Sequence, residues 1–252
     1  MARYFIELSF KGTNYHGWQI QKNATGVQQI LNKALSLKIG GDIETTGSGR
    51  TDKGVHALQQ FAHFDTEESI NGEQLAFQLN RVLPNDIVVK NIYQVNSAAH
   101  ARYDAIARSY QYKINRIKDP FLINTSYYRR GDLDLKRMNQ AAELFMGKQD
   151  FESFSKVKTD VNHFICTISK SEWTQMSDRI YYSVTADRFL RGMVRTLVGT
   201  MLDIGTRKIS LEELKKIIGS LDRKKAGRAV PAHGLFLTEV KYPSDIFINQ
   251  GP

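Results

Sequence analysis

The order of the expected strands and helices predicts an α+β fold. In the first half of the 252-residue chain, segments with strand and helix patterns follow the order strand, helix, strand, strand, helix, strand, and the second half repeats it. This is the split βαβ order of ferredoxin-like domains. The sequence therefore predicts two ferredoxin-like halves with antiparallel sheets, at residues 1–104 and 105–252.

In the first half, hydrophobic spacing predicts each element. Residues 3–10 alternate apolar and polar side chains, which is typical of a strand. Thr25 and Gln28 match a capping box before a helical pattern, and the pair Gly40-Gly41 ends that helix. The remaining expected elements are strands at about 43–46, 58–65 and 87–94, and a helix that begins at Asn71 and stops at Pro84.

The second half adds one helix to the same order. The expected strands lie at about 107–115, 164–174, 179–187 and 235–242, and the middle two form a hairpin. Helices are expected at 134–146, near 188–204, and after the capping pair Ser210 and Glu213. Arg188, Arg191 and Arg195 are spaced by three and four residues, which predicts one arginine face that is either solvated or turned to a cleft.

The charge balance favours a polyanionic partner. Lys and Arg total 35 against 26 Asp and Glu, which gives a net charge of +9. Nucleic acid is the commonest partner of such a positive field. Residues 223–228 concentrate four of these cations, in a patch that either binds phosphates or is solvated.

Cysteine and histidine usage suggests a cytoplasmic protein without a metal. The single cysteine, Cys166, cannot form an internal disulfide, and the first residues lack the layout of a signal peptide. The six histidines include no His-x-x-x-His pair, so we expect no metal site. No apolar run approaches the length of a membrane span.

The densest chemical signal is the glycine-rich segment Gly47–Gly54. Within it, Asp52 lies near Arg50 and Lys53, and nearby cations favour the ionised form of a carboxylate. The segment fits neither a phosphate-binding P-loop nor the nucleophile elbow of hydrolases. By spacing alone it is either a catalytic loop or a surface turn, because Gly and Asp favour turns.

The run Gly-Arg-Thr-Asp-Lys-Gly-Val-His-Ala, from Gly49 to Ala57, resembles the signature of the tRNA pseudouridine synthase A family. Further blocks in chain order are similar to other motifs of this family: Gly12–Gln21, Ala107–Tyr112, Asp150–Phe154, Met193–Gly199 and Gly234–Leu237. Gln149 and Gly192 stand where histidines are common in the family, which puts the contacts of those histidines in doubt.

The resemblance implies the pseudouridine synthase fold and the conversion of uridine to pseudouridine at positions 38, 39 and 40 in the anticodon stem-loop of tRNA. Asp52 would be the catalytic aspartate, and Arg195 would pair with it. Arg50 would help to flip the uridine out of its stem or fill its place, and Tyr110 would lie against the flipped base. The family also implies a homodimer that binds tRNA and needs no cofactor.

This chemistry suits a single carboxylate. The reaction breaks the C1′–N1 bond and joins C1′ to C5 without redox change, so it requires no cofactor. Asp52 either attacks C1′, attacks C6 or takes a proton from C2′, and the sequence does not choose among these. Base flipping is expected because the uridine must leave its stem, and a tyrosine on a strand can stack on it.

Two rival functions remain. A non-catalytic RNA-binding protein can be built from ferredoxin-like halves, but the chain has no good match to the aromatic RNP1 motif. A hydrolytic enzyme that removes bases needs a second group to activate water, and no carboxylate stands out as the partner of Asp52.

Overall fold

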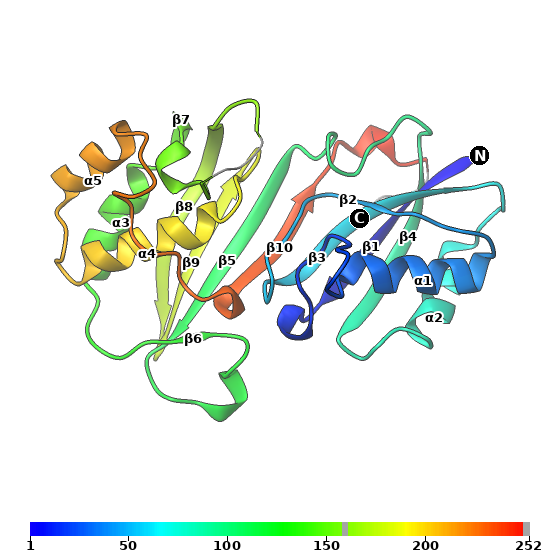
Figure 1. Cartoon of the computed structure of the whole chain (residues 1–252), viewed down its shortest axis with the longest axis horizontal. Helices are drawn as coiled ribbons and strands as arrows, with labels where there is room; N and C mark the ends of the chain where they lie inside the picture. Colours follow the sequence, from blue (N-terminus) through cyan, green and yellow to red (C-terminus); the bar gives the residue numbers. More distant parts are fainter. Residues whose placement is uncertain (158–160, 249–252) are drawn as a thin grey trace. The chain divides into compact units, whose positions relative to one another are not determined.

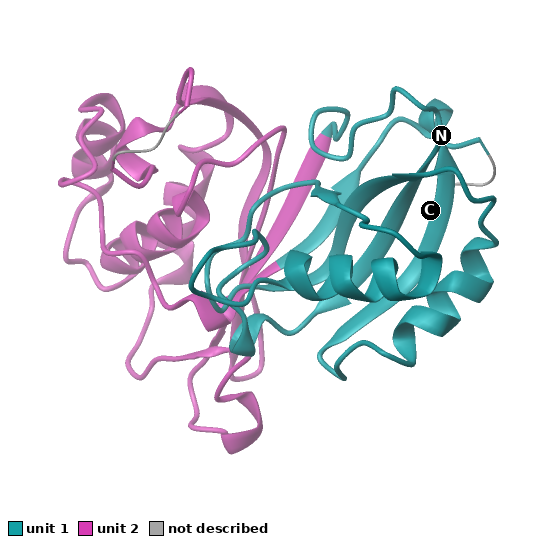
Figure 2. Cartoon of the chain, turned by 45° about the vertical axis from the view of Figure 1, so that its right-hand side comes forward, with its two compact units in different colours: residues 1–106, 237–252 teal, residues 107–236 magenta. Residues whose placement is uncertain are grey.

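The computed structural model describes residues 1–157 and 161–248, and the chain forms two compact units (Figures 1 and 2). Unit 1 comprises residues 1–106 and 237–252, and unit 2 comprises residues 107–236. Each unit contains mainly antiparallel strands together with helices, so the predicted α+β class is confirmed. The expected division of the domains between residues 104 and 105 stays a prediction.

Unit 1 is built on a sheet with the strand order β4-β1-β3-β10. The central strand β1 (Ala2–Phe10) pairs antiparallel with β3 (His56–Thr66) and with β4 (Ile87–Val95). The remaining elements of this unit are α1 (Val27–Ile39), β2 (Thr46–Gly47), α2 (Gly72–Asn80) and most of β10 (Leu235–Lys241). Its chain order from β1 to β4 is the predicted split βαβ order.

Of the two helix N-termini predicted in unit 1, one is correct and the other is wrong. The side chain of Asn71 accepts a hydrogen bond from the backbone nitrogen of Gln74 and begins α2, as predicted. The capping box expected at Thr25 and Gln28 is wrong, because Gly26 is the N-cap of α1 and offers no side-chain bond. The buried Gln28 amide instead donates to the carbonyl oxygen of Thr45, at 2.6 Å.

In unit 2 the strands follow the order β5-β9-β8-β7. β5 (Ala107–Asn115) pairs antiparallel with β9 (Arg179–Ala186), which forms the predicted hairpin with β8 (Ile165–Met176). The other elements are β6 (Tyr127–Tyr128), α3 (Leu135–Glu143), β7 (Gly147–Asp150), α4 (Met193–Gly205) and α5 (Leu211–Gly219). The capping box of α5 is confirmed, since the Ser210 hydroxyl and the Glu213 carboxylate each accept from the other's backbone nitrogen.

The helix expected near 188–204 begins later than its sequence pattern suggests. Gly192 has a φ of +73°, a left-handed conformation that α-helices do not continue, and α4 starts at the next residue. Arg188 and Arg191 therefore lie before the helix, and the predicted three-arginine face is wrong. Only Arg195 lies on α4.

Short 3₁₀ helices complete the chain, at Gly12–Asn14, Pro120–Leu122 (η2), Glu152–Phe154, Ala232–Gly234 and Ser244–Ile246. Each unit has its own apolar core. Phe5, Leu8 and Phe61 are fully buried in unit 1, as are Tyr112 and Tyr182 in unit 2. Among the helices of the described residues, none is both long and apolar enough to span a membrane.

Candidate active site

Asp52 lies in the loop between β2 and β3, and this loop is held by its own turn and by the segment that follows β1. The backbone nitrogen of Val55 donates to the carbonyl oxygen of Asp52, at 3.1 Å. The backbone nitrogen of Trp18 donates to the carbonyl oxygen of Thr51, at 3.4 Å. These hydrogen bonds fix the backbone around Asp52. Asp52 itself is half-buried, so part of the residue is exposed to solvent.

Two glycines allow the Asp52 loop and the segment after β1 to meet backbone to backbone. Gly17 has a φ of +87°, and a Cβ there would collide with the carbonyl oxygen of Thr51. Gly12 is equally restricted, because a Cβ there would collide with the carbonyl oxygen of Val55. Two glycines of the Gly12–Gln21 block therefore make room for the loop that carries Asp52.

His56 anchors the end of the same loop. Its imidazole is 1% exposed, and Nδ1 accepts a hydrogen bond from the backbone nitrogen of Gly12, at 3.0 Å. Sequence reasoning gave His56 no role, although it stands in the Gly49–Ala57 run. A polar side chain between two buried apolar residues, Val55 and Ala57, was the available signal.

The start of the loop is fastened to β3. The backbone nitrogen of Ser48 donates to the carbonyl oxygen of Phe61, at 2.7 Å. The buried Gln60 amide donates to the carbonyl oxygen of Gly49, at 3.0 Å. Arg50 follows directly and is exposed, so its guanidinium is available to a bound molecule.

In unit 2, Tyr110 stands on β5, opposite Val184 of β9. Its ring meets the edge of Phe189 with ring centroids 5.1 Å apart and an interplanar angle of 88°. Such edge-to-face pairs fix the orientation of a ring. Phe189 was missed by sequence reasoning because the expected helix included it, whereas it lies in the segment before α4.

Arg195 lies in the first turn of α4 and is tied to the chain after α5. Its Nε donates to the carbonyl oxygen of Val230 at 2.7 Å, and the backbone nitrogen of Val230 donates back to the carbonyl oxygen of Arg195. Gly199, one turn further along α4, has no room for a Cβ against the backbone of Arg228. The segment 226–230 therefore packs on α4 and restricts the Arg195 side chain.

The four predicted site residues are thus distributed over both units. Arg50 and Asp52 belong to unit 1, and Tyr110 and Arg195 belong to unit 2. Within the described parts of the chain, no group of three or more His, Cys, Asp or Glu side chains is arranged to hold a metal ion.

Comparison with known families decides what kind of protein carries this loop. A family model described as tRNA pseudouridine synthase matches residues 8–104 and 141–243. The chain belongs to the tRNA pseudouridine synthase family. The matched ranges contain Arg50, Asp52 and Arg195, whereas Tyr110 lies between them.

Full-length relatives of this synthase agree. The tRNA pseudouridine synthase A of Bacteroides thetaiotaomicron is 50% identical over 253 residues, which cover 99% of this chain and 94% of the relative. That of Bacteroides fragilis is 47% identical over 98% of this chain and 99% of its own. That of Staphylococcus aureus is 37% identical over 94% of this chain and 90% of its own. The resemblance predicted from sequence is confirmed, and the enzyme is an isomerase that acts on uridine in tRNA.

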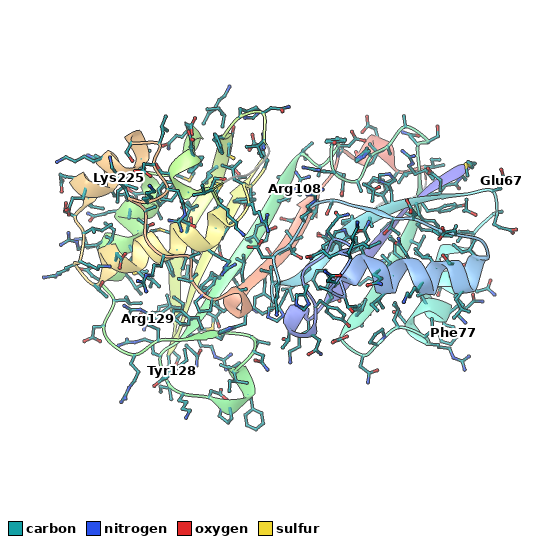
Figure 3. The ribbon with its side chains drawn as sticks, in the orientation of Figure 1. Glu67, Phe77, Arg108, Tyr128, Arg129 and Lys225 are labelled. Carbon is teal, nitrogen blue, oxygen red and sulfur yellow. The ribbon has the colours of Figure 1, made fainter. Side chains whose placement is uncertain are left out.

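Cations surround the segment of the synthase that precedes α4. Arg108 donates through Nη1 to the carbonyl oxygen of Asp187, at 2.9 Å, and is labelled in Figure 3. Nη1 of Arg188 lies 3.1 Å from Nε2 of His163. Arg188, which the helical pattern had assigned to the arginine face, therefore contacts a loop residue instead.

Proposed function

We propose that the synthase isomerises uridine at positions 38, 39 and 40 in the anticodon stem-loop of tRNA, with Asp52 as the catalytic aspartate. One observation carries the proposal, which is the fixed backbone around a half-buried Asp52 in a chain of this family. The positions follow from the resemblance to the relatives named tRNA pseudouridine synthase A.

The other predicted residues bind and orient the nucleotide. Arg50 is exposed near Asp52 in the same loop, and it helps to flip the uridine or fills its place in the stem. Tyr110 lies against the flipped base, and the edge contact of Phe189 sets the plane of its ring. Arg195, restrained by Val230, is the cation that favours the ionised form of Asp52.

In this reaction the uracil leaves C1′ through N1 and returns through C5. The C1′–N1 bond breaks, the C1′–C5 bond forms, the proton of C5 is lost, and N1 gains one, so no atom or electron is supplied from outside. The Asp52 carboxylate attacks C1′, attacks C6 or removes the C2′ proton, and these three routes share the same balance. No cofactor is required.

We further propose a cytoplasmic homodimer. The single cysteine supports a reducing compartment, because Cys166 is a buried free thiol and forms no disulfide within the chain. Burial raises the pKa of this thiol to about 12. At neutral pH this thiol is protonated and unreactive. The proposed dimer follows from the family resemblance.

The test is a pseudouridine map of unmodified tRNA incubated with the purified protein, without added metal or cofactor. Asp52→Asn should abolish the product and leave tRNA binding and thermal unfolding unchanged. Asp42→Asn is the matched control, because Asp42 is an exposed acid of the same unit. Unchanged turnover by Asp52→Asn overturns the assignment. Release of free uracil would indicate a hydrolytic enzyme, and binding without any product would indicate an RNA-binding protein.

A further inference from the structure

The segment that leaves the central strand β1 of unit 1 lies between two neighbours. β1 pairs antiparallel with both β3 and β4, so its end faces the starts of both strands. Phe10 is opposite Ala57 on one side and opposite Ile87 on the other. The exit segment, defined as residues 11–15, is therefore flanked by the loop that leads into β3 and by the turn at residues 84–86 that leads into β4.

The carboxylate of Asp86 fastens the exit segment on the β4 side. Its Oδ1 accepts a hydrogen bond from the hydroxyl of Tyr15, and its Oδ2 accepts from the side-chain amide of Asn14, at 3.0 Å. The carbonyl oxygen of Asp86 also accepts from the backbone nitrogen of Lys11, at 2.9 Å. One residue of the turn thus bonds to both ends of the exit segment.

Tyr15 is the buried residue among these partners of Asp86, since it is 6% exposed. Its hydroxyl donates to a carboxylate, and hydrogen bonds of this kind are stronger than those between neutral groups. Burial first, and then the hydrogen bond to Asp86 and its charge, raise the pKa of Tyr15. The hydroxyl therefore remains a donor at neutral pH, and the Asp86 carboxylate fixes where Tyr15 lies.

The backbone of Tyr15 bonds to the Asp52 loop on the other side. Its carbonyl oxygen accepts from the backbone nitrogen of Gly54, at 3.3 Å. Gly54 has a φ of +79° and lies inside the four-residue turn that the hydrogen bond from Val55 to the carbonyl oxygen of Asp52 closes. Asp52 is the first residue of this turn, so a displacement of Tyr15 also displaces the turn that carries Asp52.

Tyr15 thus connects Asp86 to the Asp52 turn, with its side chain bonded to one and its backbone to the other. We propose that Tyr15 and Asp86 are positioning residues for the isomerisation. The Asp86 carboxylate holds the Tyr15 hydroxyl, and the carbonyl oxygen of Tyr15 then holds the turn in the place that the reaction requires. This inference deepens the proposed function and rests on the catalytic role of Asp52.

The first experiment measures single-turnover kinetics with unmodified tRNA. Tyr15→Phe removes the hydroxyl and keeps the buried ring. The rate at saturating tRNA should fall by about 10-fold or more, because displacing a reacting group by about 1 Å costs up to about 100-fold. The dissociation constant for tRNA should stay unchanged, since Tyr15 is buried and Asp86 only half-exposed.

Substitutions of Asp86 test whether the two residues act through one bond. Asp86→Ala should lower the saturating rate as Tyr15→Phe does, and Asp86→Asn should recover part of it because an amide oxygen can accept from the hydroxyl. The double variant Tyr15→Phe/Asp86→Ala should be no slower than Asp86→Ala alone. Independent effects would instead multiply.

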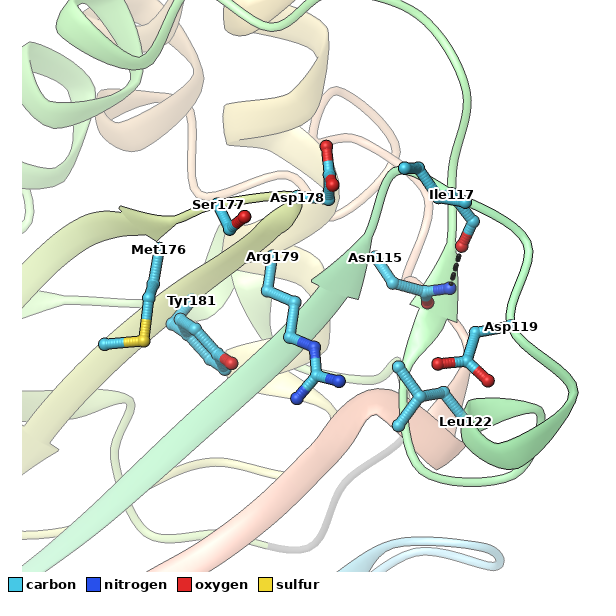
Figure 4. Close-up of a pocket in the computed structure, with 9 residues that line it drawn as sticks. All are labelled: Asn115, Ile117, Asp119, Leu122, Met176, Ser177, Asp178, Arg179 and Tyr181. Carbon is cyan, nitrogen blue, oxygen red and sulfur yellow. Dashed lines mark hydrogen bonds between the residues drawn. The ribbon is translucent and has the colours of Figure 1, made fainter.

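Tyr93→Phe is the matched control. Tyr93 lies on β4 of the same unit, and its hydroxyl donates to the carboxylate of Glu7, at 3.1 Å. This variant loses the same kind of bond, and its saturating rate should stay unchanged. Tyr181→Phe is a second control, at a tyrosine that lines an open cavity of unit 2 (Figure 4). If Tyr93→Phe is slowed as much as Tyr15→Phe, the loss is a general effect of stability and the inference is overturned.

Hydrogen exchange of the backbone amides of residues 50–56 measures the loop without reference to activity. These amides should exchange faster in Tyr15→Phe and in Asp86→Ala, because the bond that Tyr15 makes to Gly54 is loosened. In Tyr93→Phe they should exchange as in the unsubstituted protein. Unchanged exchange in Tyr15→Phe would overturn the inference.

A normal saturating rate of Tyr15→Phe would also overturn the inference, and so would a change confined to the affinity for tRNA. If Asp86→Ala does not fold, Tyr15→Phe and Asp86→Asn decide. The proposed function fails separately, because its failure is normal pseudouridine formation by Asp52→Asn. A slow Asp52→Asn with a fully active Tyr15→Phe would leave the proposed function standing and remove only the positioning role.

Discussion

The buried imidazole of His56 accepts a hydrogen bond through Nδ1 from the backbone nitrogen of Gly12, at 3.0 Å. This bond joins the end of the Asp52 loop to the residue that opens the first 3₁₀ helix, directly after β1. The position of Asp52, the proposed catalytic residue, therefore depends on the hydrogen bond that Nδ1 of the buried His56 accepts.

His56→Ala should lower turnover by about 10- to 100-fold, because displacing a reacting group by about 1 Å costs about that much. It should also lower the free energy of unfolding by about 1 to 3 kcal/mol, since the Gly12 nitrogen loses its acceptor in a buried place. His56→Asn places an amide oxygen near Nδ1 and should recover part of the turnover. His16→Ala, at an exposed histidine, is the control. Equal turnover of His56→Ala and the unsubstituted enzyme would remove His56 from this role.

Gly17→Ala should destabilise the enzyme by at least about 1 to 3 kcal/mol, the usual cost of a strained backbone conformation. The reason is twofold, because Gly17 has a positive φ and a Cβ there collides with Thr51. Gly49→Ala has open space around the new Cβ and should change the unfolding free energy little. Denaturant unfolding curves of both variants give the comparison. A Gly17→Ala protein as stable as Gly49→Ala would contradict the close approach of the two loops.

Phe189→Leu should reduce kcat/KM by about 2- to 10-fold, since aromatic pairs contribute about 0.5 to 1.5 kcal/mol beyond their burial. The expected defect is in turnover, because Tyr110 keeps its ring and loses only its fixed plane. Phe77→Leu provides the control at an exposed ring of unit 1. Single-turnover kinetics on unmodified tRNA separate the chemical step from binding. A change in affinity alone would make Phe189 an RNA contact.

Arg195→Ala should lower kcat more than it raises KM, because the proposed role of the guanidinium is to favour ionised Asp52. The Nε bond to Val230 directs the side chain, so Arg195→Lys, which lacks Nε, should recover little of the activity. Steady-state kinetics with unmodified tRNA distinguish the two parameters. A rise in KM without a change in kcat would assign Arg195 to RNA docking.

The stability of unit 1 should fall in acid through His63. Burial first, and then the nearby Arg3 and His100, lower the pKa of His63 to about 4, and its Nδ1 accepts from the backbone nitrogen of Ala101. The unfolded chain binds this proton near pH 6.5, so the stability is complete above that pH and is lost as the pH falls from 6.5 through 4. His63→Asn keeps an acceptor without the titration and should flatten the pH dependence of urea unfolding. His16→Asn should leave the slope as it is, and an unchanged slope in His63→Asn would refute the assignment.

Local patterns predicted the elements whose formation depends on their own residues. The alternation of residues 3–10 and the Ser210–Glu213 box gave β1 and the start of α5 correctly, because strand pleats and helix caps are short-range features. A tertiary contact caused one of the two failures, and the backbone conformation of a glycine caused the other. Gln28 is buried and bonds to Thr45, and a left-handed Gly192 delays α4 beyond Arg191.

The candidate site was predictable only as far as its motifs extend. The resemblance named Arg50, Asp52, Tyr110 and Arg195 because each stands in a recognisable block. The residues that hold them in place were not predictable, because Phe189, Val230 and Gly12 meet their partners only in the folded chain. A contact between residues 79 positions apart, such as Tyr110 and Phe189, leaves no periodic trace in the sequence.

The packing of residues 226–230 on α4 has a consequence for how the enzyme can vary. A Cβ at position 199 would collide with the backbone of Arg228, and Val230 makes two hydrogen bonds with Arg195. Both contacts form only if the number of residues that lead to them is kept. An insertion or deletion within residues 221–230 would shift the carbonyl that receives Nε and so move the guanidinium. Homologues that retain this arginine and glycine should therefore conserve the length of that connection even where its side chains differ.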